Sequence, residues 1–244
     1  MPKRQILIIQ KSEKWVQFLL EAFEDTASKP ENFQAIQEVL PLIQRGRPDV
    51  VFLEPALLTG PLSAALKMHR ASNPAFRVFR LGPSEDSKMS YLFDAGFPAV
   101  PSLHDFQKQL TQHLPLPETI RLLVVDDEEE IRRMFSEYFE GRTQPRYQLR
   151  TAKNGKEGEE EVRQFSPNIL VLDIKMPERD GREVYRNLKK EGLLPPTIVF
   201  FDLVSADEVL EIRRWGRPAM VEKGSRSSAM PEMAGLIKKL VYFG

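Results

Sequence analysis

Short apolar runs alternate along the chain with longer stretches that carry apolar side chains at helical spacing. The runs at 6–9 and 122–125 are wholly apolar, which is typical of strands buried on both faces of a sheet. Each run is followed by apolar residues at i, i+3, i+4, i+7 and i+8, which predicts a helix with one buried face. These residues are Trp15, Phe18, Leu19, Ala22 and Phe23 after the first run, and Ile131, Met134, Phe135, Tyr138 and Phe139 after the second.

The two halves of the chain resemble each other at a slowly drifting offset. The two helical stripes lie 116 residues apart. The segment 48–54 resembles 167–173 at an offset of 119, and 96–100 resembles 216–220 at an offset of 120. Loop insertions between two copies of one domain produce such a drift, so the chain is predicted to hold an internal repeat.

We therefore predict two domains, residues 1–114 and residues 119–244, joined by a stiff linker that contains Pro115 and Pro117. Alternation of strands and helices favours a parallel sheet with helices on both faces, so the predicted fold class is α/β. In the second domain, strands are expected near 121–126, 147–151, 169–173, 197–202 and 219–222, and helices near 128–140, 155–164, 181–190, 206–215 and 227–242.

Composition narrows the function. The 244 residues carry 35 basic and 35 acidic side chains, so nothing in the net charge favours nucleic acid as the main partner. The sequence has no cysteine, which excludes disulfides, thiolate zinc sites and cysteine nucleophiles. The apolar run at 6–9 is too short for a signal peptide or a membrane span, so we expect a cytoplasmic protein without membrane contact.

Acidic side chains stand at two predicted strand ends of the second domain. Asp126 and Asp127 follow its first strand, Asp173 follows its third, and Lys223 follows its fifth. Ligands of open parallel sheets bind at the carboxyl ends of the strands. Three converging carboxylates need a cation, and oxygen ligands favour Mg²⁺. Alone, each acidic residue would more often be a helix cap, but their combination at several strand ends favours a site.

This constellation resembles the receiver domain of bacterial two-component response regulators. The resemblance covers residues 120–243 and includes the motif Asp-x-x-Met-Pro-x-x-Asp-Gly that starts at Asp173. It implies a flavodoxin-like (βα)5 fold with a five-stranded parallel sheet. It also implies that Asp173 is the phospho-acceptor and that Lys223 binds the phosphoryl group. Mg²⁺ would be held by Asp126, Asp127, Asp173 and the backbone carbonyl of Lys175.

Several positions depart from the family pattern. The family usually has Thr or Ser at the end of the fourth strand, where this chain has Asp202 or, counted from the preceding proline, Phe201. Ser205 resembles the usual hydroxyl residue but lies a few positions late. The aromatic residue expected three positions before the lysine is Met220. We expect phosphorylation to persist with an unconventional readout.

The first domain has lost the acceptor chemistry. Gln10 and Lys11 replace the acidic pair, and Glu54 stands at the acceptor position. These side chains would not hold a metal, so we interpret this half as a degenerate receiver retained for its surfaces. An alternative is that Glu54 pairs with Lys11 and imitates a charged, metal-bound state.

We therefore predict a response regulator without a covalent output domain, because the sequence after Lys223 has room for one closing helix. Its expected partners are a sensor histidine kinase or phosphotransfer protein and a downstream protein, with homodimerisation as an open alternative and no direct contact with nucleic acid. No enzymatic activity is expected beyond self-phosphorylation and autodephosphorylation. The competing hypothesis is a phosphorylation-independent scaffold of two receiver-like interaction modules.

Overall fold

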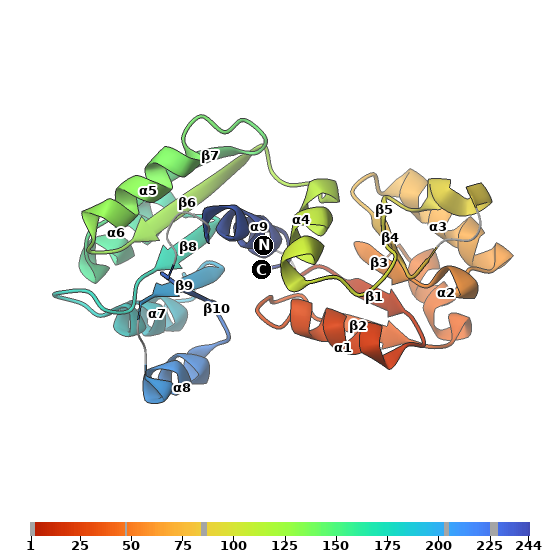
Figure 1. Cartoon of the computed structure of the whole chain (residues 1–244), viewed down its shortest axis with the longest axis horizontal. Coiled ribbons are helices and arrows are strands. Elements are labelled where there is room, and N and C mark those ends of the chain that lie inside the picture. The colour runs from red at the N-terminus through yellow and green to blue at the C-terminus, as the bar shows by residue number, and fades with distance from the viewer. Residues whose placement is uncertain (1–2, 47, 84–86, 203–204, 225–228) are drawn as a thin grey trace. The chain divides into compact units, whose positions relative to one another are not determined.

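The structure is a computed structural model that describes residues 3–46, 48–83, 87–202, 205–224 and 229–244 (Figure 1). Its contacts divide the chain into two compact units. The first unit comprises residues 1–115 and Phe243, and the second comprises residues 116–242 and Gly244. Within the described ranges, no helix has the length and apolar character needed to cross a membrane.

The first domain is built from strands that alternate with helical segments. Its β4–β5 connection holds the short 3-10 helix η2, where the second domain has the α-helix α8. In chain order the elements are β1 (Ile6–Ile9), α1 (Glu13–Ala22), β2 (Pro30–Phe33), α2 (Ile36–Gln44), β3 (Val50–Leu53), η1 (Pro55–Leu57), α3 (Gly60–Ser72), β4 (Arg77–Leu81), η2 (Ser87–Leu92), β5 (Ala95–Phe97) and α4 (Leu103–His113).

The second domain follows the same alternation with longer strands at its start. In chain order the elements are β6 (Thr119–Val125), α5 (Glu129–Phe139), β7 (Arg146–Ala152), α6 (Gly155–Phe165), β8 (Ile169–Leu172), α7 (Gly181–Lys190), β9 (Thr197–Phe201), α8 (Ala206–Trp215), β10 (Ala219–Glu222) and α9 (Ala229–Phe243).

Each domain contains one five-stranded sheet in which every pair of neighbouring strands is parallel. The strand orders are β2-β1-β3-β4-β5 and, read from the same edge, β7-β6-β8-β9-β10. Both correspond to the order 2-1-3-4-5 of flavodoxin-like folds, with the switch in strand order between the first and third strands. The predicted fold class, two flavodoxin-like (βα)5 domains, is confirmed.

The central strands are apolar on both sides because helices cover both faces of each sheet. In the second domain, alternate residues of β6 and β8 pack under α5 and α9 on one face. The intervening residues pack under α6 and α7 on the other face. In the first domain, α2 and α3 cover one face. A cluster of aromatic rings from Phe23, Phe52, Phe79, Phe97 and Phe106 fills the other.

Local signals set the helix limits. The helices predicted at 181–190 and 206–215 have these bounds in the structure. Asp180 caps α7 by accepting a hydrogen bond from the backbone amide of Arg182 at 2.7 Å. Ser205 caps α8 in a reciprocal capping box with Glu208. Most other predicted limits in the second domain differ from the observed ones by one or two residues, as expected where helix ends fray.

Candidate functional site

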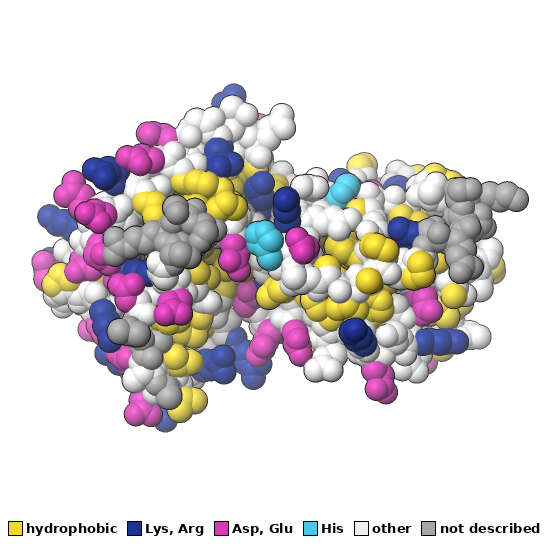
Figure 2. Space-filling view, in the orientation of Figure 1, with side chains coloured by type: hydrophobic (Ala, Val, Ile, Leu, Met, Phe, Trp, Pro, Cys, Tyr) yellow, Lys and Arg dark blue, Asp and Glu magenta, His cyan; other side chains and the backbone are white. Residues whose placement is uncertain are grey.

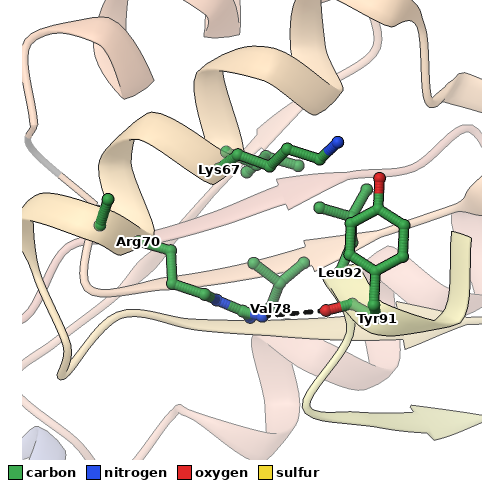
Figure 3. Close-up of a pocket in the computed structure, with 7 residues that line it drawn as sticks. Lys67, Arg70, Val78, Tyr91 and Leu92 are labelled. Atoms are coloured by element: carbon green, nitrogen blue, oxygen red, sulfur yellow. Dashed lines mark hydrogen bonds between the residues drawn. The ribbon is translucent and has the colours of Figure 1, made fainter.

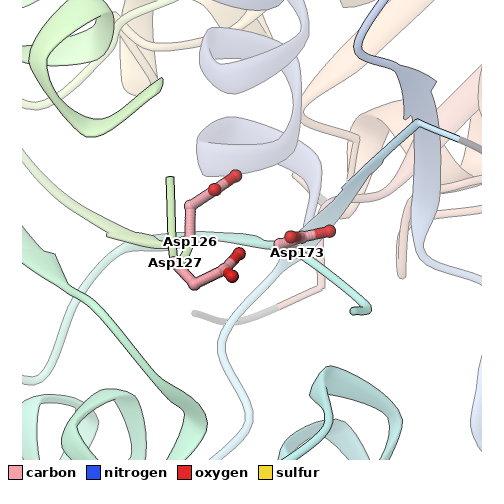
Figure 4. A group of neighbouring side chains, drawn as sticks. All are labelled: Asp126, Asp127 and Asp173. Carbon is pink, nitrogen blue, oxygen red and sulfur yellow. The ribbon is translucent and has the colours of Figure 1, made fainter. Parts of the chain in front are cut away.

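The acidic residues of the second domain meet at the carboxyl ends of β6 and β8, beside the switch in strand order. Asp126 follows the last residue of β6, and its amide donates to the carbonyl of Ala152 at 3.1 Å. Asp173 follows the last residue of β8, and its amide donates to the carbonyl of Val125 at 2.9 Å. Figure 4 shows Asp126, Asp127 and Asp173 beside one another. One carboxylate oxygen from each residue lies within 4.8 Å of those of the other two.

The turn after β6 is fixed by polar contacts. Asp126 Oδ1 accepts a hydrogen bond from the amide of Glu128 at 3.0 Å. The guanidinium of Arg132, one turn into α5, donates to the carbonyls of Asp126 and Asp127 at 2.7 and 2.8 Å. The side chain of Asp126 is therefore held in the buried interior, while Asp127 is exposed at the rim.

Lys223 is the cationic centre of the site. It follows β10, and its side chain is only 2% exposed. Its Nζ lies 3.0 Å from Asp126 Oδ2, 3.0 Å from Glu128 Oε1 and 3.0 Å from Asp173 Oδ2. A buried ammonium is stable only with such partners, so the lysine and the acids form one electrostatic unit.

The titration of these groups reflects their burial. Burial raises the pKa of Asp126 to about 6, and Lys223 offsets part of that rise. Burial also raises the pKa of Asp173, again against the pull of Lys223. Burial opposes the charge on Lys223, but Asp126, Asp173 and Glu128 together raise its pKa above the ordinary value. The cluster therefore has an excess of negative charge in a poorly solvated place, which favours a further cation.

The donor set fits Mg²⁺. All three carboxylates offer hard oxygen ligands, and ligand oxygens around an octahedral ion about 2.1 Å from each lie about 3 to 4 Å apart. The observed spread of up to 4.8 Å is close to that range, so small side-chain movements would close it. Asp126 Oδ2 is buried and, within the described residues, has no well-aligned hydrogen-bond donor despite its contact with Lys223. A metal ion would share that oxygen with the Lys223 ammonium.

The loop after Asp173 depends on Gly181. A Cβ at Gly181 would lie 1.9 Å from the carbonyl oxygen of Asp173, a distance that no side chain tolerates. The amide of Gly181 donates to the carbonyl of Ile174 at 2.8 Å and closes the loop. The loop also places the amide of Lys175 3.4 Å from Asp173 Oδ1, whereas the Lys175 side chain is 60% exposed. Metal binding by the Lys175 carbonyl stays a prediction.

The end of β9 is apolar where the family pattern has a hydroxyl. Phe201 packs with Met220 against the buried cluster of Ile174, Val199 and Ile212. The two positions named as departures from the family pattern are therefore in one apolar group. This arrangement provides no hydroxyl at the end of the strand to bind a phosphoryl oxygen.

Asp202 and Ser205 lie outside the carboxylate cluster. Asp202 is exposed, and none of the described residues pairs with its carboxylate. Among the described residues, the carboxylates that converge on a metal-binding arrangement are those of Asp126, Asp127 and Asp173, and Asp202 is not one of them. The Ser205 hydroxyl accepts from the amide of Glu208 at 3.3 Å, so it serves as a helix cap. A carboxylate inside the pocket at position 202 would repel a phosphoryl group. The exposed Asp202 is not placed to do so.

In the first domain, Gln10 and Glu54 occupy the corresponding strand ends. Gln10 Oε1 accepts from the amides of Lys11 and Ser12 at 2.8 and 3.0 Å, which copies the turn made by Asp126 without its charge. Glu54 Oε2 accepts from the amide of Lys11 at 3.4 Å. The contact that the structure shows between these residues is with the Lys11 backbone, so the alternative that Glu54 pairs with the Lys11 ammonium stays a prediction.

Two contributors were missed by the sequence analysis. Glu128 adds a fourth carboxylate that contacts Lys223, and Arg132 holds the backbone of the acidic pair. Glu128 follows Asp127 directly in an acidic run, and this run is the signal by which it could have been found. Arg132 had no signal of its own, because an arginine in the first turns of a helix is usually solvated.

Comparisons with known proteins single out the same half of the chain. Residues 122–235 match the family model described as "Response regulator receiver domain". A protein-glutamate methylesterase/protein-glutamine glutaminase 2 of Methanosarcina acetivorans is 38% identical over 119 residues, which is 48% of this chain and 33% of that protein. The regulatory protein AtoC of Escherichia coli is 28% identical over 96 residues, or 39% of this chain and 20% of that protein.

Solved structures with similar folds include the response regulator domain of Thermotoga maritima CheB. It is 23% identical, covers 50% of this chain and 96% of its own, and has a TM-score of 0.46. The chain spans about a third of the length of the curated relatives it matches first. The match to the family model includes the three buried residues of the site, Asp126, Asp173 and Lys223, and residues 122–235 of this chain are the part that matches the response regulator receiver domain.

Proposed function

We propose that the second domain is a phospho-acceptor of two-component signalling and that Asp173 takes the phosphoryl group. One observation carries the proposal: the Asp173 carboxylate lies at a strand end, 3.0 Å from Lys223 Nζ and within 4.8 Å of the acidic pair. This combination of a nucleophile, a cation and metal-binding oxygens suits phosphoryl transfer, in which catalysis is mostly positioning and charge stabilisation.

The reaction follows from these positions. A carboxylate oxygen of Asp173 attacks phosphorus in line, and an O–P bond forms while the P–N bond of the donor phosphohistidine breaks. The imidazole leaves with the electron pair of that bond and takes up a proton. The acidic partners of Lys223 keep its ammonium charged. Because this ammonium lies 3.0 Å from the Asp173 carboxylate, it can bind an oxygen of the phosphoryl group that Asp173 receives.

Asp126, Asp127 and Asp173 would hold Mg²⁺, together with the carbonyl of Lys175. When bound, the ion would offset the charge of the phosphoryl oxygens. Arg132 keeps the acidic pair in place through two backbone carbonyls, and Glu128 shares Lys223 with Asp126 and Asp173. The domain would then hydrolyse its own aspartyl phosphate, without any further enzymatic activity.

The proposed partners are proteins. A sensor histidine kinase or a phosphotransfer protein would supply the phosphoryl group, and a downstream protein would read the domain. Basic and acidic side chains are interspersed over the face of each domain shown in Figure 2, and the chain has 35 of each. Such a surface favours protein contacts over the nucleic-acid backbone.

Acetyl phosphate labelled with ³²P tests the proposal in the presence of Mg²⁺. The wild type and the control Asp207→Asn, which changes an exposed aspartate of α8, should incorporate label that is labile in alkali. Asp173→Asn should not. Equal labelling of Asp173→Asn and the wild type, or no label in any of them, would contradict the assignment of Asp173.

A second candidate is a scaffold that works without phosphorylation, and one observation favours it. Phe201 packs with Met220 in an apolar cluster, so the end of β9 has no polar side chain that a phosphoryl group would attract. Beryllofluoride with Mg²⁺ separates the two functions. Under the acceptor hypothesis, ¹⁹F NMR shows a bound resonance that Asp173→Asn abolishes, and amide shifts spread beyond the site. A bound resonance with no shift outside the site favours the scaffold.

A further inference from the structure

Two of the cavities that described residues of the first domain line differ in their chemistry. The smaller, of about 280 Å³, lies between α3 and η2 (Figure 3). Its charged groups have partners: Arg70 binds Asp94 at 2.6 Å and the Tyr91 carbonyl at 3.3 Å, and Lys67 lies 4.8 Å from the Tyr91 ring centre. The charged groups of this cavity are engaged internally, so it has little to offer a charged ligand.

The larger cavity, which we call the Glu54 cavity, has a volume of about 540 Å³. It opens at the carboxyl ends of β1, β3 and β4, where the strand order switches and where ligands of such sheets bind. Its volume is in the range of small-molecule sites, about 300–1,000 Å³. Its walls include Gln10, Trp15, Glu54, Ala56, Leu81 and Gly82.

Gly82 lines the Glu54 cavity and adds no side chain to it. Gly82 and Phe201 occupy corresponding positions in the two domains. Each lies two residues after the residue that pairs with the last residue of the third strand, Leu53 or Leu172. Phe201 packs against the apolar cluster of the second domain, whereas a Cβ at Gly82 would meet no atom within 4 Å. The left-handed φ of +91° at Gly82 favours glycine, so the opening is part of the backbone geometry.

The charged group of the cavity is the Glu54 carboxylate. It is half-buried and accepts one long hydrogen bond, from the amide of Lys11 at 3.4 Å. Within the described ranges, no lysine, arginine or histidine pairs with it. Gln10 Oε1 is already engaged by two backbone amides, so one carboxylate is too few ligands for a metal ion.

An organic cation matches a cavity that offers one carboxylate and apolar walls. Its ammonium or guanidinium would bind the Glu54 carboxylate through a charge-assisted hydrogen bond. Trp15, which is 7% exposed, offers an indole for a cation–π contact, and Leu81 and the neighbouring prolines offer an apolar wall. An anion would find no cationic partner among the described residues that line the cavity.

We propose that the Glu54 cavity binds a small organic cation, a primary amine or a guanidinium compound carried on an apolar body. The first domain is then a ligand-binding module built on the remains of an acceptor site. This inference goes beyond the proposed function of the second domain and does not depend on it.

Phenethylamine and benzamidine serve as probes, and 3-phenylpropanoate serves as an anion with a similar body. The chain has two tryptophans, Trp15 and Trp215, so its ¹H–¹⁵N spectrum has two indole signals, which Trp215→Phe assigns. The amines, at up to ~10 mM for a millimolar Kd, should shift the Trp15 signal with saturation and leave Trp215 unchanged. The carboxylate should shift neither.

Two variants test the geometry. Glu54→Gln should weaken amine binding about tenfold or more, because it removes a charged hydrogen-bond acceptor and keeps the shape. Ala56→Phe, at an exposed wall position, should fill the mouth and abolish binding. Glu38→Gln, an exposed glutamate on α2, is the matched control and should bind as the wild type does. No saturable shift of Trp15, equal binding of 3-phenylpropanoate, or wild-type affinity of Glu54→Gln would overturn the proposal.

Discussion

Replacing Lys223 with methionine should destabilise the second domain at neutral pH by several kcal/mol. Lys223 Nζ lies 3.0 Å from both Asp126 Oδ2 and Asp173 Oδ2, and these three residues are almost fully buried. At an effective dielectric constant of 20, one such contact amounts to about 5–6 kcal/mol of Coulomb attraction. Much of this offsets the desolvation of the charges. Breaking a buried ion pair by removing one partner costs about 3–5 kcal/mol net.

The cost should depend on pH in a defined direction. Burial already raises the pKa of Asp126 to about 6 against the influence of Lys223, so removing the lysine raises that pKa further. The native variant therefore takes up protons at a pH where the wild type does not, while both unfolded chains titrate alike. The difference in stability is consequently largest above pH 7 and shrinks as the pH falls through 6. Mg²⁺, which would bind the same carboxylates, should restore part of the loss at pH 7.5.

Urea unfolding of the full chain measures the loss of stability caused by Lys223→Met and its dependence on pH. In a Trp15→Phe background, the fluorescence of Trp215 reports on the second domain, because Trp215 packs against its core. Lys223→Met is compared with Lys153→Met, an exposed lysine after β7, at pH 7.5 and 5.5 with and without Mg²⁺. A loss below about 1 kcal/mol at pH 7.5, or a loss that grows at pH 5.5, would refute the electrostatic unit described above.

Three further outcomes are expected. Gly181→Ala should cost about 1–3 kcal/mol and slow labelling by acetyl phosphate, because its Cβ would displace the Asp173 carbonyl; wild-type rates would contradict the role of this loop. Mg²⁺ affinity measured by calorimetry should fall as the pH drops from 7.5 to 5.5, because the raised pKa of Asp126, about 6, makes protons compete with the ion; a constant affinity would exclude Asp126 as a ligand. Arg132→Met should lower stability by about 1.5–3 kcal/mol through the loss of two charged hydrogen bonds, and an unchanged urea midpoint would show that the clamp is dispensable.

The fold could be predicted from the sequence because several local signals agree. Wholly apolar runs predict strands buried on both faces, and the structure has β1 and β6 inside their sheets, each with a strand on both sides. The caps Asp180 and Ser205 mark where α7 and α8 begin, and Gly141 follows the end of α5 closely. Each signal acts over one or two turns of chain, so the pattern alone suffices to find it.

The site was predictable only as far as strand ends define it. Strand ends bring Asp126, Asp173 and Lys223 together, and parallel topology fixes that meeting place. The topology of the sheet does not fix the direction in which a side chain at a strand end points. The choice between Phe201 and Asp202 at the end of β9 depended on one residue of register, and a shift of one residue turns a side chain to the opposite face. The structure has Phe201 in the apolar cluster and Asp202 exposed.

The contrast between the two domains shows how one fold tolerates both a charged site and a neutral one. Gln10 and Asp126 make the same bond, a side-chain oxygen that accepts the amide two residues later, so the turn after the first strand survives without the charge. The buried lysine and the buried carboxylates, in contrast, depend on each other. A buried lysine without carboxylates, or buried carboxylates without the lysine, would leave uncompensated charge in the interior. The acids and Lys223 are therefore stable as a set or absent as a set. The first domain meets the same constraint differently, because the buried Gln10 is uncharged and the one carboxylate that remains, Glu54, is half-exposed to solvent.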